Sequence, residues 1–96
     1  MSARWHVDVE DAIAAKWSAG RAVHGPVWRG AHPLAELHNE LLDAVCYARQ
    51  ATRAGAGDPE TEATLIALLE RTRARLHALE AAGVELRTWT MPREEA

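Results

Sequence analysis

The stretch HPLAELHNELLDAVCYARQ, at residues 32–50, carries the strongest helical pattern in the chain. Apolar residues recur there every three or four positions, at Leu34, Leu37, Leu41, Val45 and Ala48. This spacing gathers them on one side of an α-helix. Pro33 suits the first helical position, where its missing N–H costs nothing. We therefore predict a long amphipathic helix over residues 33–54.

A second long helix is predicted over residues 59–82. Asp58 can cap its start, and Pro59 can take its first position. A heptad-like apolar seam follows, formed by Leu65, Leu69, Thr72, Leu76 and Leu79 and widened by Leu68. Because the connection between the two long helices is short, we expect them to pack antiparallel as a hairpin.

The rest of the chain predicts smaller elements. A short N-terminal helix is expected over residues 9–21, where Val9, Ile13 and Trp17 form one stripe. The glycines and the proline of residues 22–31 predict a loop. Residues 84–91 predict either a short strand or an extended arm with a docked tryptophan. The expected fold is a single all-α domain, residues 1–96.

The size of the chain predicts self-association. A chain of 96 residues buries a modest core, and two amphipathic helices leave apolar surface uncovered. Oligomerisation is the usual remedy, so we expect a homo-oligomeric helical bundle, a dimer or a tetramer. The charged fraction of 26% with 48% hydrophobic residues argues for a globular rather than a disordered chain.

Charge and hydropathy exclude several function classes. A net charge of -3 gives no bulk basic character for binding nucleic acid. The basic run Arg71, Arg73 and Arg75 is interpreted as a solvated helix face. No stretch approaches the length of a membrane span and no secretory signal is visible, so we expect a cytoplasmic protein. Cys46, the only cysteine, is interpreted as a packing residue.

Acidic residues gather on one side of the helix at residues 33–54. At 100° per residue, Glu36, Glu40, Asp43 and Tyr47 fall within a sector of about 60°, opposite the leucines. Carboxylates stacked in this way can hold Mg²⁺, which prefers oxygen ligands. The same spacing also occurs on ordinary solvated helices, so spacing alone leaves both interpretations open.

The segment Glu40-Leu-Leu-Asp43, followed by Ala-Val-Cys-Tyr47, resembles the Glu-x-x-Asp helix of MazG-like proteins of the all-α nucleotide pyrophosphatase superfamily. His24-Gly25 is similar to the glycine-containing loop that precedes this helix in small phage-encoded members. The likeness covers residues from about 16 to 50. It implies a Mg²⁺-dependent hydrolysis of a nucleoside triphosphate to monophosphate and pyrophosphate. It also implies catalytic, metal-binding roles for Glu40 and Asp43, with Glu36 as a third ligand.

Residues around this motif are candidates for binding the nucleotide. The loop and its flanks combine imidazole, aromatic and cationic groups, which makes them a plausible ligand wall. The candidates are Lys16, Arg21 and Arg29 for the phosphates, Trp28 and Tyr47 for the base, and His24 in the loop. An alternative for Trp28 is simple packing against the first helix.

The chain departs from the family pattern on the preceding helix. The Glu-Glu-x-x-Glu motif is missing, and Asp8, Glu10 and Asp11 have a different spacing. A partner subunit would then complete the site, or the fold would persist without catalysis. The alternative functions are a non-catalytic helical interaction protein, such as a phage accessory protein or inhibitor acting in the host cytoplasm, and a nucleotide-binding protein without turnover.

Overall fold

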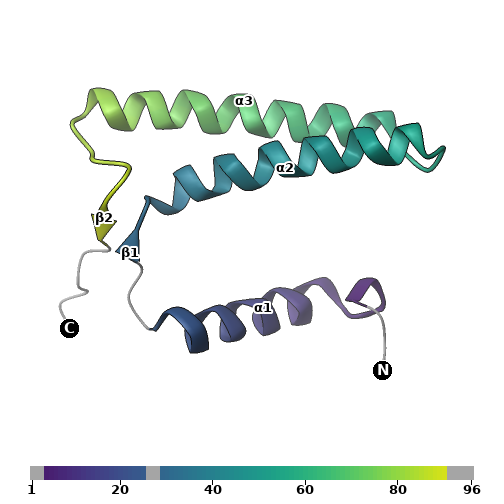
Figure 1. Ribbon diagram of the computed structural model, residues 1–96, viewed down its shortest axis with the longest axis horizontal. Helices are drawn as coiled ribbons and strands as arrows, with labels where there is room; N and C mark the ends of the chain where they lie inside the picture. Colours follow the sequence, from purple (N-terminus) through teal and green to yellow (C-terminus); the bar gives the residue numbers. More distant parts are fainter. Residues whose placement is uncertain (1–3, 26–28, 91–96) are drawn as a thin grey trace. The chain divides into compact units, whose positions relative to one another are not determined.

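The computed structural model describes residues 4–25 and 29–90. Its described part is helical apart from one short β pair, which confirms the predicted all-α class (Figure 1). The elements in chain order are a 3₁₀ turn Arg4–His6, α1 Val9–His24, β1 Arg29–Gly30, α2 Pro33–Arg53, α3 Pro59–Ala81 and β2 Trp89–Thr90. Contacts divide the chain into two units, one with α1 and the other spanning Arg29–Thr90. The single domain therefore stays a prediction.

Helix α1 starts where the sequence predicts and ends later. The Asp8 carboxylate accepts hydrogen bonds from the Glu10 and Asp11 amides at 3.1 and 3.4 Å, which satisfies two donors of the first turn. Gly20 does not end the helix, which continues to His24. The termination comes at Gly25, whose φ of 83° favours glycine. The predicted loop at residues 22–31 is therefore too long at its start.

Helix α2 begins at Pro33 and is capped by a histidine. The Nδ1 atom of His32 accepts a hydrogen bond from the Leu34 amide at 3.0 Å. This contact replaces the usual Ser, Thr, Asp or Asn oxygen at the cap. The helix ends at Arg53, one residue before the predicted end, and Gly55 follows with a φ of 79°.

Helix α3 begins at Pro59 behind an aspartate cap, as predicted. Asp58 accepts hydrogen bonds from the Thr61 hydroxyl at 2.7 Å and from the Glu60 amide at 3.2 Å. These bonds, the one from the Thr61 hydroxyl above all, favour the charged form and lower the pKa of the Asp58 carboxyl below its usual value. The helix ends at Ala81, one residue early, and Gly83 follows with positive φ.

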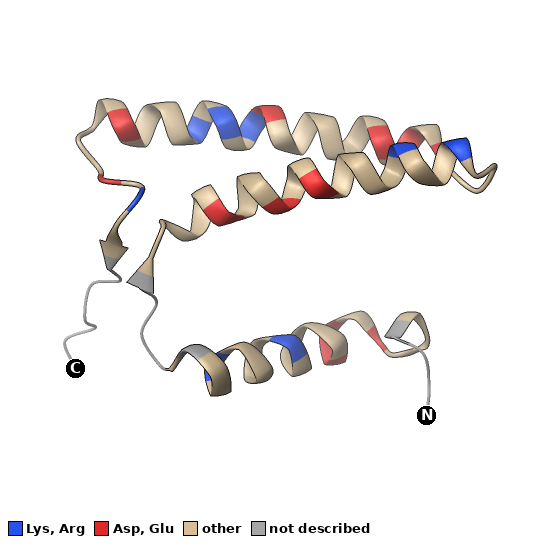
Figure 2. Cartoon of the chain, in the orientation of Figure 1, with Lys and Arg blue, Asp and Glu red and all other residues tan. Residues whose placement is uncertain are grey.

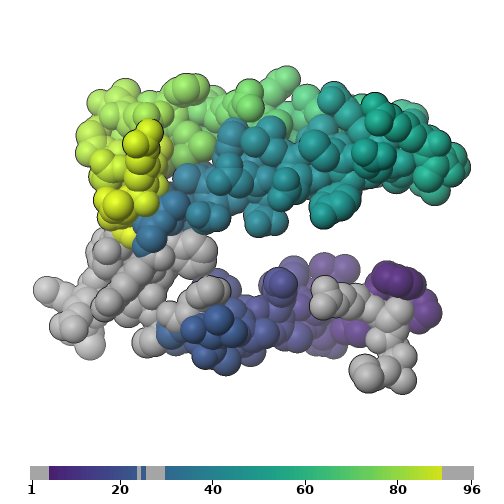
Figure 3. Space-filling view, in the orientation of Figure 1, coloured from purple at the N-terminus to yellow at the C-terminus, as the bar shows by residue number. Residues whose placement is uncertain are grey.

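The core lies between α2 and α3, which pack side by side and form one continuous surface (Figures 1 and 3). Leu41, Val45 and Leu69 are the buried hydrophobic residues of the described part, with Leu65 and Ile66 partly buried against them. The predicted apolar stripes are broader than this core. Leu37 and Leu68 are 46% and 41% exposed, because two helices cover only a narrow seam on each other.

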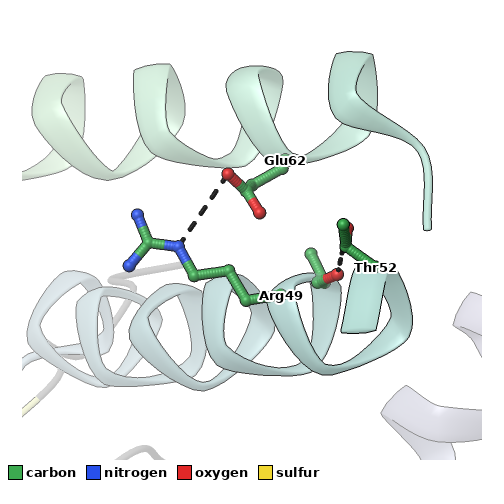
Figure 4. Close-up of polar contacts among 4 residues, drawn as sticks. Arg49, Thr52 and Glu62 are labelled. Atoms are coloured by element: carbon green, nitrogen blue, oxygen red, sulfur yellow. Dashed lines mark hydrogen bonds and ion pairs between the residues drawn. The ribbon is translucent and has the colours of Figure 1, made fainter. Parts of the chain in front are cut away.

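Polar contacts flank this core. The Arg49 Nε atom lies 3.8 Å from the Glu62 carboxylate across the two helices, and the Thr52 hydroxyl donates to the Ala48 carbonyl within α2 (Figure 4). Nearer the start of α2, Nε of Arg73 donates to Nε2 of His38 at 2.9 Å. In these two cross-helix contacts, the earlier residue of α2 meets the later residue of α3, and the later residue of α2 meets the earlier one.

The segment after α3 folds back to the start of α2. Strands β1 and β2 pair antiparallel, with Arg29 opposite Thr90 and Gly30 opposite Trp89. The His32 amide donates to the Leu86 carbonyl at 2.8 Å, and the rings of His32 and Trp89 have centroids 4.6 Å apart. The predicted strand in the tail thus exists, but it is only two residues long and its partner lies in the predicted loop.

We expect Leu69→Ala to destabilise the hairpin strongly, because it removes a large share of a very small core. The free energy of unfolding should fall by about 2–4 kcal/mol. Urea denaturation followed by circular dichroism measures this change. The matched control is Leu42→Ala on α2, since Leu42 is outside the buried cluster and its truncation should cost under about 1 kcal/mol. Equal losses in the two variants would contradict this account of the core.

A second prediction concerns the tight turn between α2 and α3. A Cβ placed on Gly57 would lie 2.5 Å from both the Cα and the backbone N of Thr52, so the turn would have to shift. Gly57→Ala should therefore destabilise the hairpin by about 1 kcal/mol or more. Gly20→Ala is the control, because Gly20 has open space around it and alanine favours a helix. Thermal melting should show a lower midpoint only for Gly57→Ala.

Candidate functional site

The acidic ridge of α2, formed by Glu36, Glu40 and Asp43, is the candidate site. The helix places these residues on the side opposite the buried Leu41 and Val45. Figure 2 shows the three acids in succession along the first half of α2. Glu36 is half-buried, while Glu40 and Asp43 are exposed. The helical period therefore brings the predicted acids to one side, as the sequence suggests.

The carboxylates of the acidic ridge are unengaged. Within residues 4–25 and 29–90, none of the three forms a hydrogen bond or an ion pair. This contrasts with Asp8 and Asp58, whose carboxylates cap helices. Carboxylates of the ridge are thus available to an external ligand or partner.

The donor chemistry of the ridge suits Mg²⁺. This ion takes oxygen ligands and commonly binds to one or two carboxylates, with water and phosphate oxygens in its other positions. Glu40 and Asp43 fit such a role, one helical turn apart. The described part of the chain nevertheless holds no group of three His, Cys, Asp or Glu side chains arranged to hold a metal. One copy of the chain therefore does not present the three-carboxylate ligand set.

The surroundings of the ridge are more open than expected. Tyr47 is 75% exposed, so its ring is free to stack on a ligand but does not enclose one. Cys46 is also exposed, which contradicts its interpretation as a packing residue. It lies outside the α2–α3 seam because two helices alone do not cover the flank of α2 on which it stands.

The predicted phosphate and base contacts fall in two units of the chain or outside the described residues. Lys16 and Arg21 are exposed on α1, in the other unit of the chain. Trp28 lies outside the described residues, as do the side chains of His24 and Arg29. The structure therefore groups only Glu36, Glu40, Asp43 and Tyr47, which share α2.

A feature that the sequence did not single out is an open groove of about 650 Å³ beside the α2–α3 seam. Leu34 of α2 lines it together with a side of α3 formed by Leu68, Arg71, Thr72, Ala74, Arg75 and Ala78. All three arginines are exposed, as predicted for a solvated face. They do not share one side, because Arg71 and Arg75 line the groove whereas Arg73 hydrogen-bonds to His38. Arg71 and Arg75 lie three and seven residues after Leu68, and this helical spacing separates them from Arg73.

Comparisons with known proteins add no relative. No family model, no curated protein and no solved structure matches the chain. Among the helices of the described part, none is long and apolar enough to cross a membrane. The MazG-like resemblance consequently rests on the short motif of α2.

Proposed function

We propose that the chain is a Mg²⁺-dependent nucleotide pyrophosphohydrolase of the MazG-like kind. The observation that carries the proposal is the acidic ridge, whose carboxylates face away from the core and make no internal contact. Asp58 and Glu62, by contrast, are committed to a helix cap and to an ion pair. Three uncommitted acids beside one another favour a role in binding.

The roles of the chain's own residues follow from their chemistry. Glu40 and Asp43, one helical turn apart, would hold Mg²⁺, and Glu36 would be the third ligand of a site that a second copy completes. When bound, this ion would offset phosphate charge and make a water molecule more nucleophilic. Tyr47 would stack on the base from the same side of α2. Attack of water on the α-phosphorus would release the pyrophosphate leaving group and leave a monophosphate.

The proposal includes an oligomer. Within the unit Arg29–Thr90, the acidic ridge is a single row of acids with no second row beside it. A second copy of the chain would supply the further groups of the site. In this proposal α2 and α3 form an antiparallel hairpin that joins other copies in a helical bundle. The ridge would then be completed at the contact between copies.

The enzymatic proposal predicts Mg²⁺-dependent release of pyrophosphate from at least one nucleoside triphosphate in a panel. Glu40→Gln and Asp43→Asn should each lower kcat by about a hundredfold or more, because each removes a charge that stabilises the transition state through the metal. The matched control is Glu70→Gln, which neutralises an exposed acid on α3. Circular dichroism should show equal folding in all variants. Turnover that persists without divalent metal, or unchanged in Glu40→Gln, would exclude this site.

A second candidate is a non-catalytic interaction protein. The observation that favours it is the exposure of Leu42 and Tyr47 next to the acidic ridge, together with the missing group of three metal ligands in the described residues. Exposed apolar and aromatic groups among charges are typical of surfaces that bind proteins. The acidic ridge would then recognise a basic surface on a partner.

The interaction candidate predicts a specific partner at this ridge and no nucleotide turnover. A photo-crosslinking residue in place of Tyr47 should capture a defined protein in cells, and Asp43→Arg should abolish the adduct by reversing a charge. The matched control places the same crosslinker at Ala63, which is exposed on α3. Identical adducts from both positions, or an adduct insensitive to Asp43→Arg, would count against the interaction candidate.

A further inference from the structure

One side of the hairpin carries an apolar strip that the α2–α3 contact leaves uncovered. Leu34 and Leu68 line the groove beside the seam, and Leu37 stands 60° from Leu34 around α2. Leu37 and Leu68 are both substantially exposed. Removing such apolar side chains from water is favourable, so a strip of this kind favours association.

Helical angles show that this strip lies on one face and the polar cross-helix contacts on the other. His38 and Leu37 stand 100° apart, on either side of the direction in which Leu41 and Val45 point. On α3, Arg73 and Leu68 likewise flank Leu69. Since His38 bonds to Arg73 across the seam, Leu37 and Leu68 share the opposite face. We call this opposite side of the hairpin the leucine face.

Charges border the leucine face with opposite signs. On α2, Glu40 lies 60° beyond Leu37, and Glu36 follows one turn earlier. On α3, Arg71 and Arg75 line the groove beyond Leu68. Neither arginine forms an ion pair within the part of the chain that the structure describes. The leucine face therefore runs from an acidic edge on α2, across apolar side chains, to a basic edge on α3.

The two edges are also in register. The contacts of His38 with Arg73 and of Arg49 with Glu62 show that each step forward on α2 matches a step back on α3. This relation puts Glu36 level with Arg75 and Glu40 level with Arg71. Figure 2 shows the acids of α2 and the arginines of α3 along the same half of the hairpin.

We propose that a second copy of this chain docks on the leucine face to form a four-helix dimer. The two-fold axis runs parallel to the helices, so α2 of each copy lies against α3 of the other. Glu36 and Glu40 then face Arg75 and Arg71 of the second copy, and the same pairs recur by symmetry. Leu37 and Leu68 of both copies are buried in the centre.

The arrangement of charge identifies a second copy as the occupant. The charges of the leucine face differ across its width, so a partner needs an acidic and a basic edge side by side. A second hairpin has both, with matching spacing. Helix α1 carries acids at its start and Lys16 and Arg21 later, so its charges differ along its length instead. Nucleic acid would meet the acidic edge and be repelled.

This dimer specifies the contact between copies that the proposed function includes, but it does not depend on hydrolysis. It would place two arginines of one copy opposite the acids of the other, where phosphate oxygens would bind. Association is measured without nucleotide and without Mg²⁺, so a failure of the dimer and a failure of catalysis give separate results.

The experiment is a charge-exchange test on the full-length protein by sedimentation equilibrium. The wild-type protein should have twice the mass of one chain. Glu36→Arg with Glu40→Arg should weaken association by about a hundredfold, because like charges then face each other, and so should Arg71→Glu with Arg75→Glu. An equimolar mixture of the two variants should restore a dimer, since every pair is again of opposite sign. The chain that carries all four substitutions should dimerise on its own.

The control is Glu70→Arg with Glu80→Arg, which changes the net charge equally but lies off the leucine face, because both residues stand on the Arg73 side of α3 and are exposed. This variant should remain dimeric. Circular dichroism verifies that every variant keeps its helices. A monomeric wild-type protein, unaltered association of both charge-reversed variants, or their failure to associate in the mixture would each overturn the proposal.

Discussion

The contact between α2 and α3 is the constraint on which the rest of the structure depends. Leu41, Val45 and Leu69 are the hydrophobic side chains that the described residues bury, and they fix how far each helix is rotated about its axis. Once Leu41 points at α3, the helical period turns Glu40 and Asp43 outward. The same rotation leaves Leu37 at the edge of the seam. The rotation of each helix about its axis therefore determines both which residues form the core and which residues form the candidate surfaces.

The helices could be predicted because their signals are local. Pro33 and Pro59 each follow a capping side chain, and the apolar spacing behind them is regular. The predicted end of α1, near Gly20, is too early, although Gly25 followed by Pro26 is the stronger stop signal in the sequence. The pairing of β2 with β1 could not be predicted, because the two strands are distant in the chain and each has only two residues.

Part of the candidate site could likewise be predicted from local signals, and part could not. Helical period alone predicts that Glu36, Glu40 and Asp43 share one side, and the structure has them there. The position of the α3 arginines relative to α2 could not be predicted from the sequence. Only the contact of His38 with Arg73 reveals which side of α3 faces which side of α2. The residues of α1 belong to another unit, so the helical period of α2 says nothing about where they lie relative to the acidic ridge. With no matching relative, function is argued from the chemistry of the ridge and its motif.

The β pair has a consequence for the order in which this chain folds. The turn between α2 and α3 is short, so the helices meet after closing a small loop. Joining Arg29 to Thr90 closes a ring of about sixty residues, which costs more chain entropy and is repaid by few contacts. The ring therefore closes after the helices have docked, when their packing already holds its ends together. The pair of β1 and β2 is therefore the last part to form and the first to open.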